Sequence, residues 1–215
     1  MTAGENCSER YRHWRIRSNG EKGMNLYARH PNFFSNGSRN LREKRRIQTY
    51  VLKMGGEYML NKEKLVRSME KWISFAESLR GLDERVWTMA IGEGKWAVHD
   101  IVSHMMLWDR YYMETAVSKV RRDEPLTLAN FDFEGFNRDA AVYGRAKSRD
   151  ELLDEAVQVR REIVEHLRAI PEEHYSAVHA AVDCKFVITE YIADFAWHDD
   201  HHMNQIASLS AVPKA

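Results

Sequence analysis

Apolar side chains recur with a helical period in four stretches of the chain. In each stretch an apolar residue returns every three or four positions, which is typical of a helix with one buried face. The stretches begin near Met59, Ala97, Ser148 and Thr189, and each is about 20 residues long. No segment shows the sustained alternation of apolar and polar residues that a strand produces. The pattern therefore predicts an all-α fold, a four-helix bundle.

Four stripes of apolar positions support this prediction. They consist of Leu65, Met69, Trp72, Ala76 and Leu79; of Ile101, Met105, Trp108, Tyr112 and Ala116; of Leu152, Ala156, Val159, Ile163, Leu167 and Ile170; and of Tyr191, Phe195, His198, His202, Gln205 and Leu209. Ser148 and Glu151 can form a capping box at the start of the third helix, and Pro171 marks its end. We expect the second helix to span Ala97–Val120 and the last to span about Thr189–Leu209.

The connection between the second and third helices, Arg121–Lys147, is long for a compact domain. Connections of this length are usually functional or cross the bundle. It carries enough aromatic area to pack over one end of the bundle, in Phe131, Phe133, Phe136 and Tyr143. We expect a long crossover loop.

Residues 1–58 differ in composition from the remainder. They carry twelve Lys and Arg against five Glu, a net charge of +7, which leaves −7 for residues 59–215 because the whole chain has a net charge of zero. Apolar residues follow no sustained period there, and only Asn40–Met54 could form a short helix. We expect a basic, disordered extension, with a nucleic-acid-binding arm as the alternative that we rank last.

The start of the folded domain suggests a further hypothesis. The peptide before Met59, Gly55–Tyr58, can be back-translated as a purine-rich run, as in a bacterial ribosome-binding site. Met59 would then be the natural start, and the domain would span residues 59–215.

Composition also restricts the location of the protein. No run approaches the roughly 18 to 20 apolar residues that a membrane-spanning helix requires, and Met1–Asn19 lacks the apolar segment of a secretory signal. Two cysteines, Cys7 and Cys184, fit a reducing compartment and predict no disulfide framework. We expect a cytoplasmic protein without membrane contact.

Three histidines occupy inward positions. His198 and His202 lie one turn apart in the stripe of the last helix, and His104 lies between Ile101 and Trp108 in the second helix. Neutral imidazole binds Zn, Ni, Cu and Fe, and three protein ligands leave positions open for water or substrate. We expect one divalent metal, although each histidine taken alone could be a hydrogen-bonded core residue.

Neighbouring residues suggest how such ligands could be supported. Asp100 and Asp194 each precede a proposed ligand by four residues, where a carboxylate can accept the second ring N–H; a solvated position is the alternative for both. His201 is expected to flank the site. A zincin protease is disfavoured, because Asp199 stands where that motif has a catalytic Glu.

Two segments resemble the DinB/YfiT superfamily. They are Trp96–Asp109 and His198–Ile206, and the resemblance covers about residues 59–209. It implies a four-helix bundle that binds a divalent metal through one histidine of the second helix and a pair on the last. Carried over, these ligands are His104, His198 and His202.

The same resemblance implies a broad range of activities. Members include DNA-damage-induced proteins without settled activity, metal-dependent hydrolases, maleylpyruvate isomerases and transferases that use bacillithiol or another low-molecular-weight thiol, and many are homodimers. We expect a metal, first Zn or Ni, to activate water or a thiol against a small electrophile in detoxification or stress. Arg160, Tyr143 and Asn137 are candidates to orient the substrate. The alternative is a non-catalytic stress protein that binds a metal or a small ligand.

Overall fold

Four long helices form the framework of the domain. The computed structural model describes residues 62–129, 132–182 and 184–210. The helices are α3 (Lys62–Ser78), α5 (Val98–Tyr112), α8 (Arg149–Ala169) and α9 (Ile188–Ser210). The predictions of a disordered extension, of a helix over residues 40–54 and of a start at Met59, as well as Phe131, lie outside the described residues. The expected four-helix bundle is confirmed.

The second predicted helix is interrupted by a wide turn. After α5 the chain continues through a π-helical segment, Met113–Val117, and then α6 (Ser118–Arg121). The hydroxyl of Thr115 donates to the carbonyl of Tyr111 at 2.6 Å at this irregularity. The continuous helical path therefore agrees closely with the predicted span, and the π turn is a local departure from it.

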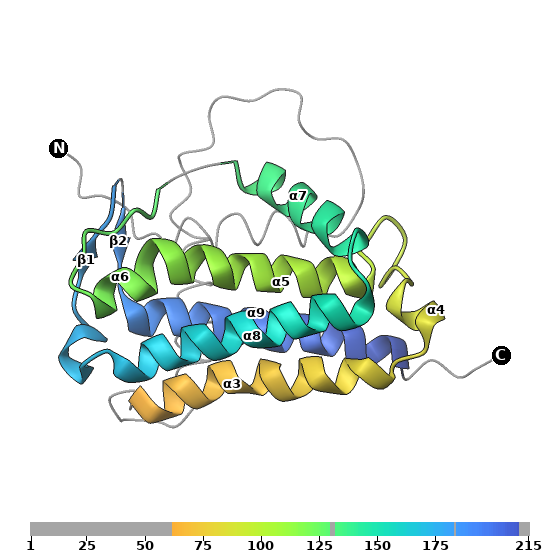
Figure 1. Cartoon of the computed structure of the whole chain (residues 1–215), viewed down its shortest axis with the longest axis horizontal. Helices are drawn as coiled ribbons and strands as arrows, with labels where there is room; N and C mark the ends of the chain where they lie inside the picture. The colour runs from red at the N-terminus through yellow and green to blue at the C-terminus, as the bar shows by residue number, and fades with distance from the viewer. Residues whose placement is uncertain (1–61, 130–131, 183, 211–215) are drawn as a thin grey trace, which may run out of the picture.

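The helices are connected in an unusual order in space. α3 packs against α8 and α9, and α5 packs against the same two helices, so consecutive α3 and α5 are not principal neighbours. The passage between them contains a short turn, Leu79–Gly81, and α4 (Glu84–Trp87). Figure 1 shows that α5 and α8 run in one direction while α3 and α9 run in the other. Because α5 and α8 are parallel neighbours, the chain must return along the bundle between them.

A helix makes this return. α7 (Phe133–Arg145) lies on the outer side of α5, and the side chain of Asp132 caps its start by accepting from the Gly135 N–H at 3.0 Å. Phe133 and Phe136 pack on Trp108, with ring centroids 5.6 and 4.7 Å away. The predicted crossover exists, but the expectation of a loop is wrong for this segment: an amphipathic helix buries its small residues against α5.

The connection between α8 and α9 contains minor elements. A short turn, Glu172–His174, is followed by the antiparallel strands β1 (His179–Ala180) and β2 (Lys185–Phe186). Cys184, beside β2, is disulfide-bonded, whereas the sequence predicted a reducing compartment and no disulfide framework. Over the described parts of the chain, no helix has the length and apolar character needed to cross a bilayer.

α7 and α5 approach closely at Gly144. A Cβ atom built there would lie 2.7 Å from Cβ of Ser103 and 2.8 Å from the carbonyl oxygen of His99. Both distances are well below van der Waals contact, and the second neighbour is backbone, which cannot rotate away. Glycine is therefore required at this contact.

Gly144→Ala should lower the free energy of unfolding by about 1–3 kcal/mol through overpacking, as measured by urea denaturation. Gly81→Ala is the matched control, because a Cβ atom at Gly81 meets nothing within 4 Å. It should change stability by no more than about 0.5 kcal/mol. Equal effects of the two substitutions would contradict the close approach.

Candidate metal centre

Three imidazoles from two helices meet inside the bundle. Nε2 of His198 on α9 lies 3.1 Å from Nε2 of His104 on α5 and 3.0 Å from Nε2 of His202. One ligand atom from each of the three lies within 4.8 Å of the others. The helical spacing of four residues places His198 and His202 on one face of α9, and the antiparallel packing of α5 places His104 opposite them. The sequence prediction thus selected three residues that the fold brings together.

The three imidazoles are shielded from water. His104, His198 and His202 are 1%, 2% and 6% exposed. Burial lowers the pKa of His104 to about 3, against the opposing hydrogen bond with Asn137. Burial, with smaller electrostatic contributions from the neighbouring His104 and His201 rings, lowers the pKa of His202 well below its ordinary value. Both rings are therefore neutral at physiological pH and can act as ligands.

A hydrogen-bonded chain determines which nitrogen of His104 carries its proton. The indole N–H of Trp108 donates to Oδ1 of Asn137 at 2.9 Å, and His104 Nδ1 lies 2.9 Å from the same oxygen. Because the indole nitrogen can only donate, the amide atom facing it must be the oxygen. His104 therefore carries its proton on Nδ1, which leaves the lone pair of Nε2 directed at the other two histidines.

The other ring nitrogen of His202 has a similar partner. Its Nδ1 lies 2.8 Å from Oε1 of Gln205, one turn further along α9. With an amide oxygen as acceptor, Nε2 of His202 also presents a lone pair to the centre. Lone pairs converging at 3.0–3.1 Å repel one another unless a proton or a cation lies between them. Three imidazoles are a donor set that suits a divalent transition metal, so these residues fit such an ion.

Aromatic rings line the surroundings of the centre. The half-buried ring of Trp96, just before α5, lies 4.8 Å from that of His104, and Phe195 lies 6.1 Å from His198. On the outer side of α9, Trp197 stacks on His201 with ring centroids 5.3 Å apart and an angle of 4°. This position agrees with the expectation that His201 flanks the ligands.

The carboxylates expected to support the ligands differ in their roles. Asp100 accepts from the backbone N–H of Ala97 at 3.1 Å and pairs with Arg145 of α7 at 2.9 Å through both of its oxygens. Asp100 therefore caps α5 and holds α7. The hydrogen-bond partner of His104 is Asn137, in the place that the sequence predicted for Asp100. Asp194 is buried one turn before His198, and its support of that ring stays a prediction.

Arg160 lies in the centre of the bundle as part of a buried charge cluster. Its Nε donates to Asp109 at 2.7 Å, and its two terminal nitrogens donate to Asp199 at 2.5 and 3.1 Å. Nη1 also donates to the carbonyl of Met69 on α3, and the side chain is fully buried. Burial raises the pKa of both carboxyl groups against the opposing effect of Arg160. In this structure the guanidinium holds four helices together.

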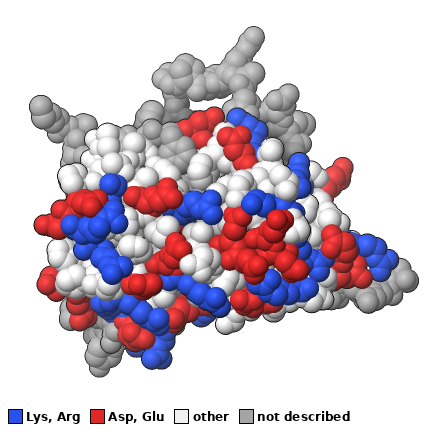
Figure 2. Space-filling model, viewed as in Figure 1, with Lys and Arg blue, Asp and Glu red and all other residues white. Residues whose placement is uncertain are grey.

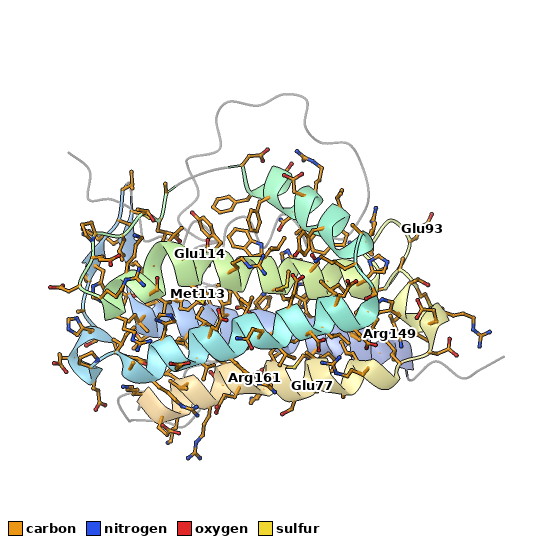
Figure 3. The ribbon with its side chains drawn as sticks, viewed as in Figure 1. Glu77, Glu93, Met113, Glu114, Arg149 and Arg161 are labelled. Carbon is orange, nitrogen blue, oxygen red and sulfur yellow. The ribbon has the colours of Figure 1, made fainter. Side chains whose placement is uncertain are left out.

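The exposed neighbour of Arg160 behaves differently. Arg161 points toward Glu77 of α3 across the surface of the bundle, as Figure 3 shows, with a charge separation of 3.5 Å. Figure 2 shows acidic and basic side chains interspersed over this face. The nucleic-acid-binding arm that the sequence offered as an alternative, residues 1–58, lies outside the described residues.

Tyr143 also binds within the protein. Its hydroxyl donates to Glu155 of α8, and Lys147 lies over its ring and pairs with the same carboxylate at 2.7 Å. The structure thus places Asn137 beside the histidines, whereas Arg160 and Tyr143 contact carboxylates elsewhere. Their substrate-orienting roles stay predictions.

Comparison with known proteins gives a family. The model of the DinB superfamily matches residues 67–206, which include the three histidines, the whole of α5 and α8 and most of α3 and α9. The chain belongs to the DinB superfamily.

The fold of this DinB-like chain also resembles a solved structure. YfiT from Bacillus subtilis, described as "a probable metal-dependent hydrolase with an unusual four-helix bundle topology", superposes with a TM-score of 0.58 at 14% identity. The match covers 73% of this chain and 89% of YfiT, and at this identity it shows the fold alone. No curated protein matches the chain significantly.

Sequence reasoning missed the chain of hydrogen bonds that supports His104. It named Asn137 only as a substrate contact and Trp108 only as a core residue. The available signal was weak, since a polar residue between Phe133 and Ala140 becomes an inward position only once that segment is recognised as a helix. Gln205 was placed in the inward stripe, but its contact with His202 was not predicted.

The buried histidines should make the metal-free protein acid-sensitive. His104 has a folded-state pKa of about 3, below its ordinary value of 6.5, so the unfolded chain binds the proton first as the pH falls. This contribution to stability is present above pH 6.5 and decreases toward pH 3, by up to about 1.4 kcal/mol per pH unit for each such histidine. The lowered pKa of His202 also makes the folded protein less stable as the pH falls.

Urea denaturation of chelator-treated protein at pH 7.5 and pH 5.5 tests this expectation. The wild-type chain should lose more stability between these values than His104→Gln, which has one buried imidazole fewer. His174→Gln, a substitution outside the cluster, should keep the wild-type difference. The same pH dependence in wild type and His104→Gln would contradict the assignment of a buried neutral ring.

Proposed function

We propose that this DinB-like protein is a metal-dependent enzyme that attacks small electrophilic substrates. His104, His198 and His202 hold one divalent transition metal, with Zn and Ni as the first candidates. The nucleophile is water in a hydrolase or a low-molecular-weight thiol such as bacillithiol in an S-transferase. The observation that carries this proposal is the convergence of three Nε2 atoms at 3.0–3.1 Å in a buried site.

The residues of the chain have separate tasks in this proposal. When bound, a divalent cation supplies a Lewis acid that promotes loss of a proton from water or from a thiol near neutral pH. Neutral imidazoles add no negative charge, so they leave the charge of the ion available for that purpose. Burial keeps His104 and His202 neutral, and the acceptors at Asn137 and Gln205 direct their free nitrogens inward.

The surroundings favour a substrate with apolar surface. Trp96 is half-buried beside His104, and Phe195 packs near His198. Of these two rings only Trp96 keeps exposed surface, since Phe195 is 2% exposed, so Trp96 is the ring that can contact the apolar part of an ester or of an alkylating compound. The description of YfiT as "a probable metal-dependent hydrolase" supports the hydrolytic version. A homodimer and a role in detoxification stay predictions from the family, and a cytoplasmic location stays a prediction from the composition.

Metal content tests the binding half of the proposal. The full-length chain, purified without chelator or added metal, should contain about one transition-metal ion per chain by elemental mass spectrometry. His198→Ala should lose it, because two ligands remain of three, while His174→Ala should retain it. A wild-type chain that stays metal-free after incubation with Zn and Ni would show that the histidines are polar core residues.

Turnover tests the catalytic half. The metal-loaded chain should hydrolyse members of a panel of small activated esters, or transfer bacillithiol to an electrophile such as 1-chloro-2,4-dinitrobenzene. His198→Ala should fall to the background rate while retaining its helical circular dichroism spectrum. A chain that binds one metal and turns over no substrate in either assay would instead be a binding protein that sequesters metal.

A further inference from the structure

We propose that Asn137 of the crossover helix α7 is a positioning residue for the metal ligand His104, and that Trp108 holds Asn137 in the required orientation. The inference rests on the proposed metal site but assigns a new role to residues outside it. Asn137 then acts through His104 rather than on a substrate. α7 becomes the element that prepares one of the three ligands before the metal arrives.

The argument begins with one amide oxygen that accepts two hydrogen bonds. Oδ1 of Asn137 receives the indole N–H of Trp108 and the Nδ1–H of His104, each at 2.9 Å. The three residues are 4%, 0% and 1% exposed, so water cannot replace a missing partner from outside. Both lone pairs of the oxygen are used, which fixes the geometry of the amide and of the imidazole.

The opposite orientation of the amide is disfavoured by Trp108. If the side chain of Asn137 turned over, its NH2 group would face the indole N–H, and two donors would meet in a buried place. The amide nitrogen would then also face His104, whose Nδ1 would have to accept and whose proton would move to Nε2. A protonated Nε2 of a neutral imidazole cannot bind a metal. Trp108 therefore selects the tautomer of His104 that is able to bind one.

α7 is held to α5 on the C-terminal side of Asn137 by contacts that do not involve the histidine. The hydroxyl of Ser103 donates to the carbonyl of Ala140 at 2.6 Å. Gly144 permits close contact of the helices, and Arg145 pairs with Asp100 at 2.9 Å. On the N-terminal side, Phe136 packs on Trp108. The contacts that dock α7 on α5 are thus different from the hydrogen bond by which Asn137 positions His104. A substitution at Ser103 removes a docking contact and leaves that hydrogen bond in place.

Zinc affinity provides the first measurement. Full-length variants are compared with wild type by competition against a chromophoric chelator at pH 7.5. Asn137→Leu should weaken zinc binding by about 10–100-fold, the usual effect of losing a partner of a ligating histidine. Asn137→Asp retains an acceptor and should stay close to wild type or bind more tightly. Trp108→Phe should give an intermediate loss, because the ring remains while the donor that orients the amide is absent.

Ser103→Ala is the matched control for loosened docking of α7. It should bind zinc as tightly as wild type. The proposal is overturned if Asn137→Leu keeps wild-type affinity, if Asn137→Asp fails to restore binding, or if Ser103→Ala weakens binding as much as Asn137→Leu. If Asn137→Leu does not fold, the zinc affinities of Trp108→Phe and Ser103→Ala are compared instead. Only Trp108→Phe should bind zinc more weakly than wild type.

Nitrogen-15 NMR of the chelator-treated protein provides a readout that needs no metal. In wild type the chemical shifts of His104 should show a proton fixed on Nδ1, and Asn137→Leu or Trp108→Phe should lose this single tautomer. If wild type binds no zinc, the proposed function fails, but this measurement still tests the positioning role. A His104 tautomer that is unchanged in both variants overturns it.

Discussion

The structure depends on burying three imidazoles with their Nε2 atoms directed at one another. An apolar core gains nothing from this arrangement, because the lone pairs repel and each ring loses its hydration. Hydrogen bonds to the Nδ1 side of His104 and His202 offset part of that cost. A proton on one Nε2 atom can relieve one of these contacts, and a cation at the point where the lone pairs meet would relieve all of them. The bundle therefore carries a locally unfavourable cluster whose natural compensation is a metal.

α9 must be oriented accurately for this cluster to form, and a second buried cluster fixes its rotation. Asp199 follows His198 directly, so the two side chains leave the helix about 100° apart. His198 faces α5, while Asp199 forms two hydrogen bonds with Arg160 of α8. Arg160 also binds Asp109 of α5 and the backbone of α3. Removing one partner from such a buried pair commonly costs about 3–5 kcal/mol, which makes rotation of α9 away from this register unfavourable.

The sequence predicted the helices and the three clustered histidines because both follow from local periodicity. A stripe at spacings of three and four residues indicates which side of a helix is buried, and three histidines on such stripes are conspicuous. The partners of the ligands could not be predicted in this way. Asp100 has suitable spacing from His104, yet it caps its own helix and binds Arg145. The actual partner, Asn137, comes from a helix that the prediction had taken for a loop, and only the tertiary packing brings it to His104.

The crossover between α5 and α8 connects the topology with the chemistry. Two parallel neighbouring helices require a connection of about their own length. If this connection were an irregular loop, many of its backbone N–H and C=O groups would need water as their hydrogen-bond partner on the surface of the bundle. A helix satisfies those groups internally and presents one face to α5. That face needs small residues where the backbones approach, as at Gly144, and it can carry one polar side chain inward if that side chain is fully bonded. The side chain of Asn137 is fully bonded, through Trp108 and His104. The helix that connects α5 with α8, α7, therefore also orients a histidine of the candidate metal centre.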